Sequence, residues 1–343
     1  MVILDRFHTQ ITGKWHIGRY NEHDGAYGID TVNTQGYLPG FMHRSPPGSL
    51  QFKDFRLTNT VLDMLDDASR LTGPFYLQMW ARMTHRPILV PEEHENRYRD
   101  VEINETRLSD EVRGKIEICR GRVADPLDSY RTYMVELWGM DQQVGRVLDK
   151  LDDLELSDDT VVIFTSDHGA APVGTAQADE DPGVCRLMGC PGPFRGGKHE
   201  ATEGGVRVPL MVRWPGHVRQ GHVNHHTTFS FVDFLPTILS LAGADESNLP
   251  SDLDGIDQSD VWLGSNEPAF RPGTICWHTT SHAWRWVVLW NNIKLVESAA
   301  GDRMVFDIDA DPEELHNLWQ DGTQNWQNLT NALAEYQLYP VPR

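Results

Sequence analysis

The sequence predicts an α/β protein, with a mostly parallel sheet flanked by helices and a small C-terminal α+β subdomain. Two observations support this fold class. Short apolar runs rich in β-forming residues alternate with helical patterns in the first part of the chain, and the later part reads as short strands followed by one helix. Because the pattern changes near Asn266, we expect a larger α/β domain over residues 1–265 and a C-terminal subdomain over residues 266–343.

The elements of the larger domain are predicted from their apolar patterns. The run PFYLQMWARMTH, Pro74 to His85, has an apolar core and ends in polar residues, as a strand does. From Tyr130 to Leu151, apolar residues recur at helical spacing. The run TVVIFTSD, Thr160 to Asp167, is short, apolar and β-branched, which suits a buried parallel strand.

Three further elements precede the change in pattern. The segment Ala170 to Gly197 is rich in Gly, Pro and Asp and predicts a long loop, a type that is usually functional inside a compact domain. The run Val208 to Gly216 predicts another buried strand. The run Phe231 to Gly243 predicts a helix that ends at Gly243.

The C-terminal subdomain is predicted to hold a short antiparallel sheet and a terminal helix. The run TICWHTTSHAWRWVVLWNNIKLV indicates short strands with a turn at Trp290 to Asn292. The run MVFDIDADPEELHNLW indicates a strand, an Asp-Pro turn and the terminal helix.

The chain is strongly acidic, with 30 Lys and Arg against 50 Asp and Glu and a formal net charge of -20. Such a surface repels nucleic acid and anionic membranes, so we expect neither as a partner. No apolar run approaches the roughly 18 residues that a membrane span needs. An anionic substrate would therefore have to be held by a local cluster of cations.

The four cysteines, Cys119, Cys185, Cys190 and Cys276, lack the paired Cys-x-x-Cys spacing of a zinc site. We expect plain buried or loop thiols. The alternative is a local disulfide between Cys185 and Cys190, which are the only two close in sequence.

Side chains suited to binding an anion and a metal lie at the ends of predicted strands or beside them. They are Lys14 and His16 after the β-prone run HTQIT, His85, Asp167, His168, and Lys198 in the loop FRGGKHE. Ligands of open α/β sheets bind where the carboxyl ends of strands converge, so we expect all six at one edge. Cations that balance charge and a metal that polarises an oxygen suit a tetrahedral oxyanion.

Four motifs carry these residues. They are GKWHIG at Gly13 to Gly18, THRP at Thr84 to Pro87, FTSDHG at Phe164 to Gly169 and RGGKHEATEGGVRVPLMVRWPG at Arg195 to Gly216. The set resembles the signatures of the type I sulfatases, in the alkaline phosphatase superfamily, and weaker similarity continues to Trp319. The resemblance implies an alkaline phosphatase-like fold, an arylsulfatase-like hydrolysis of a sulfate monoester, and a small-molecule or carbohydrate sulfate ester as partner.

The resemblance also implies roles for the cationic residues. Lys14 and His16 match the pair beside the family's nucleophile, where His16 would assist the breakdown of the covalent sulfated intermediate. His85 and Lys198 match the groups that hold the sulfate and help the ester oxygen to leave.

Asp167 and His168 match the family's metal pair. Many relatives have Asn at the second position and bind calcium, which prefers oxygen ligands, whereas imidazole suits zinc or manganese. Calcium is the expected ion, and the identity of the divalent metal stays open. Asp5, after the short apolar run VIL, is a weaker candidate ligand.

Sulfatases carry two features upstream of the GKWH motif. One is an Asp-Asp pair that supplies further metal ligands, and the other is a Cys-x-Pro-Ser-Arg stretch whose Cys or Ser is oxidised to formylglycine, the nucleophile. Twelve residues precede Gly13, and none of the four cysteines stands in such a stretch. We therefore expect the larger part of a sulfatase without its N-terminal segment, with weak calcium binding and negligible activity by residues 1–343 alone.

Two alternatives stay open. A phosphate or phosphonate ester hydrolase of the same superfamily fits the Asp-His pair, although the stretch EGGVRVP favours a sulfatase. A pseudoenzyme or binding protein that kept the fold would also lack the nucleophile. Taken singly, each residue is more often a solvated or structural group, and their joint placement is what supports a site.

Overall fold

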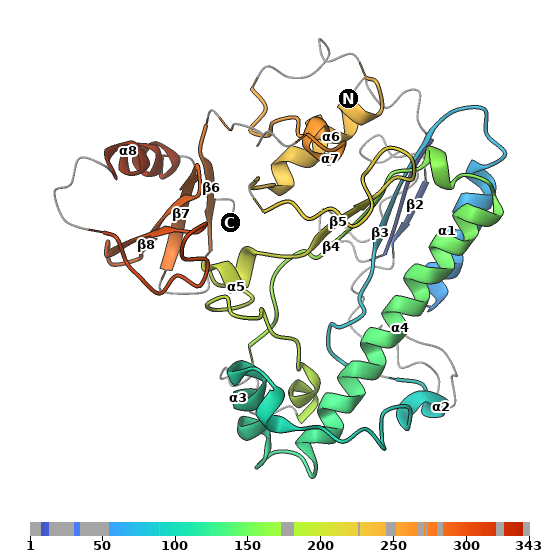
Figure 1. Cartoon of the computed structure of the whole chain (residues 1–343), viewed down its shortest axis with the longest axis horizontal. Helices are drawn as coiled ribbons and strands as arrows, with labels where there is room; N and C mark the ends of the chain where they lie inside the picture. Colours follow the sequence, from blue (N-terminus) through green and yellow to red (C-terminus); the bar gives the residue numbers. More distant parts are fainter. Residues whose placement is uncertain are drawn as a thin grey trace. The chain divides into compact units, whose positions relative to one another are not determined.

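The structure, a computed structural model, describes residues 8–13, 31–34, 55–88, 90–172, 182–225, 227–244, 252–265, 271, 273–279, 284–319 and 326–338 (Figure 1). The chain forms two compact units, the first of residues 1–160 and 173–189 and the second of residues 161–172 and 190–343. The domain boundary predicted after residue 265 stays a prediction.

A three-stranded parallel sheet lies in the first unit (Figure 1). Its strands β1 (His8–Gly13), β2 (Thr31–Thr34) and β3 (Phe75–Trp80) follow the order β2-β1-β3, and both pairings are parallel. The strand predicted from Pro74 is β3, and the predicted α/β class with parallel strands is confirmed.

Two amphipathic helices, α1 (Phe55–Ala68) and α4 (Pro126–Asp153), pack against each other in the first unit. An ion pair joins them, with 2.6 Å between Lys150 Nζ and Asp66 Oδ1. The helix predicted from its apolar spacing is α4. It begins at Pro126 because Asp125 caps its first turn and proline suits the first helical position.

Shorter helices fill the segment between β3 and α4. They are α2 (Glu92–Glu95), a 3-10 turn at Glu105–Arg107 and α3 (Asp110–Cys119). Helix α3 is capped by Ser109, whose hydroxyl accepts a hydrogen bond from the backbone N–H of Val112.

Cys119, at the end of α3, forms a disulfide with Cys185 in the 3-10 turn Pro182–Arg186. The expected thiols at these positions, and the alternative Cys185–Cys190 disulfide, are therefore wrong. Both α3 and this turn pack against α4, which brings the two cysteines within 5.8 Å between Cα atoms across 66 positions of sequence. Cys190 and Cys276 are free thiols.

A two-stranded sheet in the second unit consists of β4 (Val162–Thr165) and β5 (Leu210–Arg213). Both strands were predicted, but they pair antiparallel and Met211 is 56% exposed. The expectations of a parallel pairing for β4 and of a buried strand from Val208 to Gly216 are wrong here. An apolar run indicates a strand with apolar neighbours and does not encode the direction of the strand beside it.

Three helices of the second unit are α5 (Glu203–Val206), α6 (Phe234–Leu241) and α7 (Ser259–Trp262). The helix predicted from Phe231 is a 3-10 turn that continues into α6. Gly243 follows with φ of +65°, the left-handed conformation that ends helices, so the predicted stop is confirmed.

A four-stranded antiparallel sheet and a helix form the C-terminal part of the second unit (Figure 1). The elements are β6 (Ile275–His278), β7 (Trp284–Trp290), β8 (Ile293–Ser298), β9 (Arg303–Asp307) and α8 (Gln327–Tyr336), with the strands in sequence order. One apolar cluster lies on each face, and α8 packs on the face of Leu295. The predicted sheet is confirmed.

The turn between β7 and β8 confirms the prediction at Trp290 to Asn292. Asn291 and Asn292 have φ of 46° and 66°. Asparagine tolerates this left-handed conformation, which two-residue hairpin turns require.

The terminal helix lies further along the chain than predicted. In place of a helix, Leu315 and His316 donate their backbone N–H groups to the carboxylate of Asp311, and the N–H of Leu318 donates to the carbonyl of Val305 in β9. These bonds hold the segment after the Asp-Pro turn against the sheet, and the helix is α8.

Within the described ranges, every helix is too short or too polar to cross a membrane.

Candidate active site

The loop after β4 carries the acidic and imidazole groups of the candidate site. The side chain of Asp167 is 80% exposed and that of His168 is 36% exposed. The distance between Asp167 Oδ2 and His168 Nε2 is 3.3 Å. His168 Nδ1 lies 3.0 Å from the carbonyl oxygen of Gly169 and donates to it, because a carbonyl only accepts. A ring held in this way turns Nε2 toward the side of Asp167.

Backbone hydrogen bonds join this loop to the loop of Lys198. The N–H of Lys198 donates to the carbonyl of Ala170 over 2.8 Å. The N–H of Gly169 donates to the carbonyl of Gly205 in α5 over 2.9 Å, and the N–H of Gly204 donates to Arg195 over 2.7 Å. The structure thus brings the Asp167–His168 loop, the Lys198 loop and α5 into one assembly, which we term the glycine clamp.

Glycine is required at the contacts of the glycine clamp, because backbone meets backbone there. A Cβ atom on Gly169 would lie 1.8 Å from the carbonyl oxygen of Gly204. One on Gly204 would lie 2.4 Å from the carbonyl oxygen of Gly196, and one on Gly205 would lie 2.3 Å from that of Glu200. The glycines of the DHG, RGG and EGG stretches therefore allow the close approach that places Asp167 and Lys198.

Replacing Gly169 by Ala is expected to lower the free energy of unfolding by about 1 to 3 kcal/mol, since the new methyl group forces the clamp apart. The matched control is Gly273→Ala in the same unit, where a Cβ would meet no atom within 4 Å. Urea unfolding followed by tryptophan fluorescence measures both variants. Equal stability of the two variants would contradict the packing described.

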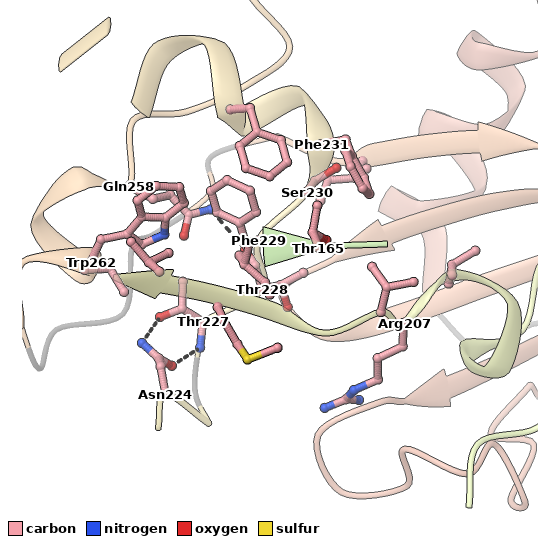
Figure 2. A pocket seen from close by; sticks show the side chains of 18 of the residues that line it. Thr165, Arg207, Asn224, Thr227, Thr228, Phe229, Ser230, Phe231, Gln258 and Trp262 are labelled. Carbon is pink, nitrogen blue, oxygen red and sulfur yellow. Dashed lines mark hydrogen bonds between the residues drawn. The ribbon is translucent and has the colours of Figure 1, made fainter. Parts of the chain in front are cut away.

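A groove of the second unit is lined by Asp167 and His168, together with His199 and Glu200, the residues after Lys198. Figure 2 shows aromatic side chains along it, among them Phe229 and Trp262, whose rings lie 5.2 Å apart between centroids. A groove with aromatic walls beside a few polar groups suits the organic part of an ester.

Cys276 also lines the groove but is a poor nucleophile. Burial raises the pKa of its thiol, and the charges of Asp254 and Glu335 add to this, while a hydrogen bond with Thr274 opposes it. A raised pKa leaves less thiolate at neutral pH, and the thiolate is the reactive form.

The remaining predicted residues belong to the first unit. Lys14, His16 and Asp5 lie outside the described residues. His85 belongs to the first unit, where its Nδ1 donates to the carbonyl oxygen of Arg86 over 2.6 Å. The register pairs Gly13 with Trp80, so β1 and β3 end together before Lys14 and His85. That all six residues share one edge stays a prediction.

The metal ligands available in the described residues are few. Asp167 and His168 offer one carboxylate and one imidazole, against the about six to eight oxygens that calcium takes. Among the residues that the structure describes, no group of three or more His, Cys, Asp or Glu side chains could hold a metal ion. The pair suits part of a metal shell, and it does not make a calcium site by itself.

Three buried charged residues of the site were not singled out from the sequence. They are Glu203 in α5, Lys294 in β8 and Glu314 in the Asp-Pro turn. A lysine inside the apolar strand run IKLV was the signal that could have pointed to a buried ion pair.

Comparison with known proteins identifies the family. The model of the sulfatase family matches residues 5–244, and the model described as N-sulphoglucosamine sulphohydrolase, C-terminal, matches residues 198–338. Steryl-sulfatase of Mus musculus is 40% identical over 158 residues, which are 43% of this chain and 24% of that protein. N-acetylgalactosamine-6-sulfatase of Homo sapiens is 28% identical over 322 residues, 83% of this chain and 53% of that protein. The chain thus spans about half the length of this second relative.

Solved structures share the fold. Ps i-CgsB, in complex with k-i-k-neocarrahexaose, superposes with a TM-score of 0.69 at 20% identity. The match covers 97% of this chain and 71% of the Ps i-CgsB chain. A protein in complex with its substrate D-glucosamine-2-N,6-O-disulfate superposes with a TM-score of 0.62 at 18% identity, covering 96% and 78%. With a family model that matches most of its length, the chain belongs to the sulfatase family.

Proposed function

We infer that this chain forms the sulfate-binding part of a sulfuric ester hydrolase, which cleaves the sulfate monoester of a small molecule or a carbohydrate. The glycine clamp carries the proposal, because it holds the Asp167–His168 loop against the loop of Lys198. Membership of the sulfatase family and the saccharide ligands of two structural neighbours support it.

The cationic residues would act on the sulfate group directly. In a chain with a net charge of -20, an anionic ester needs local positive charge, and Lys198 supplies it next to the Asp167–His168 loop. We assign to Lys198 and His85 the tasks of holding the sulfate and assisting the departure of the ester oxygen. Lys14 and His16 are assigned to the side of the nucleophile, with His16 aiding breakdown of the sulfated intermediate.

Sulfatases of this family use a calcium ion and a formylglycine residue. We assign Asp167 and His168 as two ligands of a divalent ion, calcium by family. When bound, such an ion polarises a sulfate oxygen. The formylglycine is not assigned to any of the four cysteines, because none of them stands in the Cys-x-Pro-Ser-Arg stretch.

Replacing Lys198 by Ala is expected to weaken the binding of 4-nitrocatechol sulfate to residues 1–343 by at least about tenfold, since a hydrogen bond to a charged group is lost. Isothermal titration calorimetry in a buffer with calcium measures the affinity. The matched control is Lys150→Ala, which removes a lysine paired with Asp66 in the first unit. Unchanged affinity of the Lys198 variant would contradict the proposal, and stronger binding of the matching phosphate ester would favour a phosphatase.

A further inference from the structure

We propose that Lys294 is a positioning residue of the sulfate site, which sets the Asp167–His168 and Lys198 loops through α5. The inference rests on the proposed function, because it assumes that the two loops bind sulfate. Its evidence is the set of buried contacts that Lys294 makes. The Lys294 side chain is 0% exposed, and its Nζ lies 2.9 Å from Glu203 Oε1 and 2.8 Å from Glu314 Oε1. These three side chains, termed the buried triad, join α5, strand β8 and the Asp-Pro turn.

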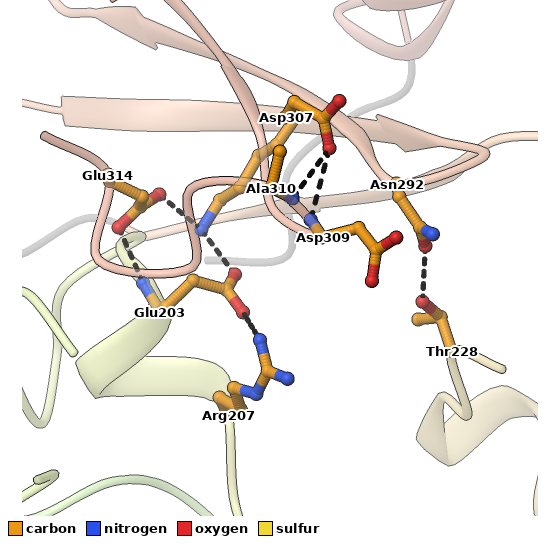
Figure 3. Close-up of polar contacts among 9 residues, drawn as sticks. Glu203, Arg207, Thr228, Asn292, Asp307, Asp309, Ala310 and Glu314 are labelled. Carbon is orange, nitrogen blue, oxygen red and sulfur yellow. Dashed lines mark hydrogen bonds and ion pairs between the residues drawn. The ribbon is translucent and has the colours of Figure 1, made fainter. Parts of the chain in front are cut away.

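Glu203 receives contacts from three directions. Its carboxylate pairs with Lys294 through Oε1 and with Arg207 through Oε2, at 3.4 Å. Its own backbone N–H donates to Glu314 Oε2 over 2.8 Å. Figure 3 shows Glu203 and Glu314 facing each other, with Arg207 on the other side of the Glu203 carboxylate. The first residue of α5 is therefore fixed by its main chain and its side chain.

The residues that follow Glu203 make the glycine clamp. Gly204 donates its N–H to Arg195, at the start of the RGGK stretch, and Gly205 accepts from the N–H of Gly169. Lys294 contacts Glu203, which precedes Gly204 by one residue and Gly205 by two, and so lies next to two of the three backbone bonds of the glycine clamp. A displacement of Glu203 moves the glycine clamp, because Gly204 and Gly205 are in close contact with other backbone atoms and cannot shift independently of them.

Lys294 is the only positive charge among the three residues of the buried triad, so its charge balances those of both carboxylates. Glu314 is 0% exposed and Glu203 6%, so water does not stabilise their charges. Arg207 is 46% exposed and reaches only one Glu203 oxygen. Without Lys294, and among the described residues, Glu203 would keep only its pair with the half-exposed Arg207, and Glu314 only the N–H of Glu203. The two buried carboxylates would lose the ammonium group that they share, and one would have to move away or take up a proton. Either response frees the start of α5.

Hydrogen exchange followed by mass spectrometry on residues 1–343 tests the inference without requiring catalysis. In Lys294→Met, the amides of residues 167–170 and 195–206 are expected to exchange at least about tenfold faster than in the unchanged chain. The matched control is Leu295→Ala, also 0% exposed on β8 but directed at the opposite face, toward α8. In that control, faster exchange is expected at α8, with the two loops unchanged.

Two further variants keep the test decisive. Glu314→Gln retains the Lys294–Glu203 pair, so we expect a smaller increase in the exchange rate of residues 167–170 and 195–206 than in Lys294→Met. If Lys294→Met does not fold, Glu314→Gln tests the positioning role in its place. Lys294→Arg retains the charge and is expected to restore slow exchange at least in part. Unchanged exchange at residues 167–170 in both Lys294→Met and Glu314→Gln would overturn the inference, as would equal acceleration in Leu295→Ala.

Aryl sulfate binding separates this inference from the proposed function. If both hold, Lys294→Met weakens the affinity of residues 1–343 for 4-nitrocatechol sulfate, as Lys198→Ala does. If Lys294→Met accelerates exchange in the two loops while Lys198→Ala leaves affinity unchanged, the positioning contact stands and the sulfate site is wrong. If Lys198→Ala weakens binding and Lys294→Met changes neither exchange nor affinity, the positioning role is overturned.

Discussion

Residues 1–343 alone are expected to hydrolyse an aryl sulfate at least about three orders of magnitude more slowly than the same residues fused behind a segment that supplies the nucleophile. The segment comes from a sulfatase relative and carries the Asp-Asp pair and the Cys-x-Pro-Ser-Arg stretch. The reason is chemical: the four cysteines of residues 1–343 lie outside such a stretch, and burial raises the pKa of the Cys276 thiol. Without the aldehyde hydrate, water must attack the sulfur unaided.

Turnover of 4-nitrocatechol sulfate with calcium present measures this difference, after mass spectrometry has verified formylglycine in the fused protein. The control is the fused protein with its motif cysteine changed to alanine, which is expected to fall back to the rate of residues 1–343. Rapid turnover by residues 1–343 alone would show that another group serves as nucleophile. Absence of turnover in the verified fusion would show that the fold has lost the chemistry.

Lys198→Ala and His85→Ala, each in the fused protein, are expected to lower kcat/KM by at least about two orders of magnitude. In the proposed roles, each would remove a contact that strengthens as charge moves onto the sulfate and ester oxygens in the transition state, and such contacts have effects of this size. For the same reason the loss should fall more heavily on kcat than on KM.

Two matched controls accompany these variants. Lys150→Ala removes an ion-paired lysine of α4, and His316→Ala removes a histidine that follows the Asp-Pro turn and whose side chain is 79% exposed. Both are expected to retain kcat/KM within about twofold, as surface changes away from a site do. A loss of kcat/KM in the controls equal to that of Lys198→Ala would contradict a direct role in the reaction.

Local patterns predicted much of the fold. The apolar spacing of α4, the β-prone run of β3 and the Asn-Asn turn before β8 each depend on residues close in sequence, and the structure confirms all three. The α/β class followed from the order of such elements.

Long-range pairing was beyond these patterns. The antiparallel contact of β4 with β5 and the disulfide from Cys119 to Cys185 depend on which elements pack together, and neither leaves a local signal. The terminal helix was placed too early because Asp311 holds the chain by side-chain hydrogen bonds, which compete with helix formation.

In the candidate site, too, residues in local motifs were predictable from the sequence and contacts between distant residues were not. Asp167, His168 and Lys198 were identified because strand ends and motifs point to them, and the structure joins their loops. Lys294 and Glu314 lie far along the chain from these motifs, so their link to Glu203 emerged only from three-dimensional contacts.

A crystal structure of residues 1–343 with 4-nitrocatechol sulfate and calcium chloride tests the central claim most directly, namely that the glycine clamp forms the sulfate site. We expect the sulfate group within hydrogen-bond distance of Lys198 Nζ, with the aryl ring in the groove. A sulfate ester bound elsewhere, with Lys198 and Asp167 both in contact with solvent only, would contradict the claim.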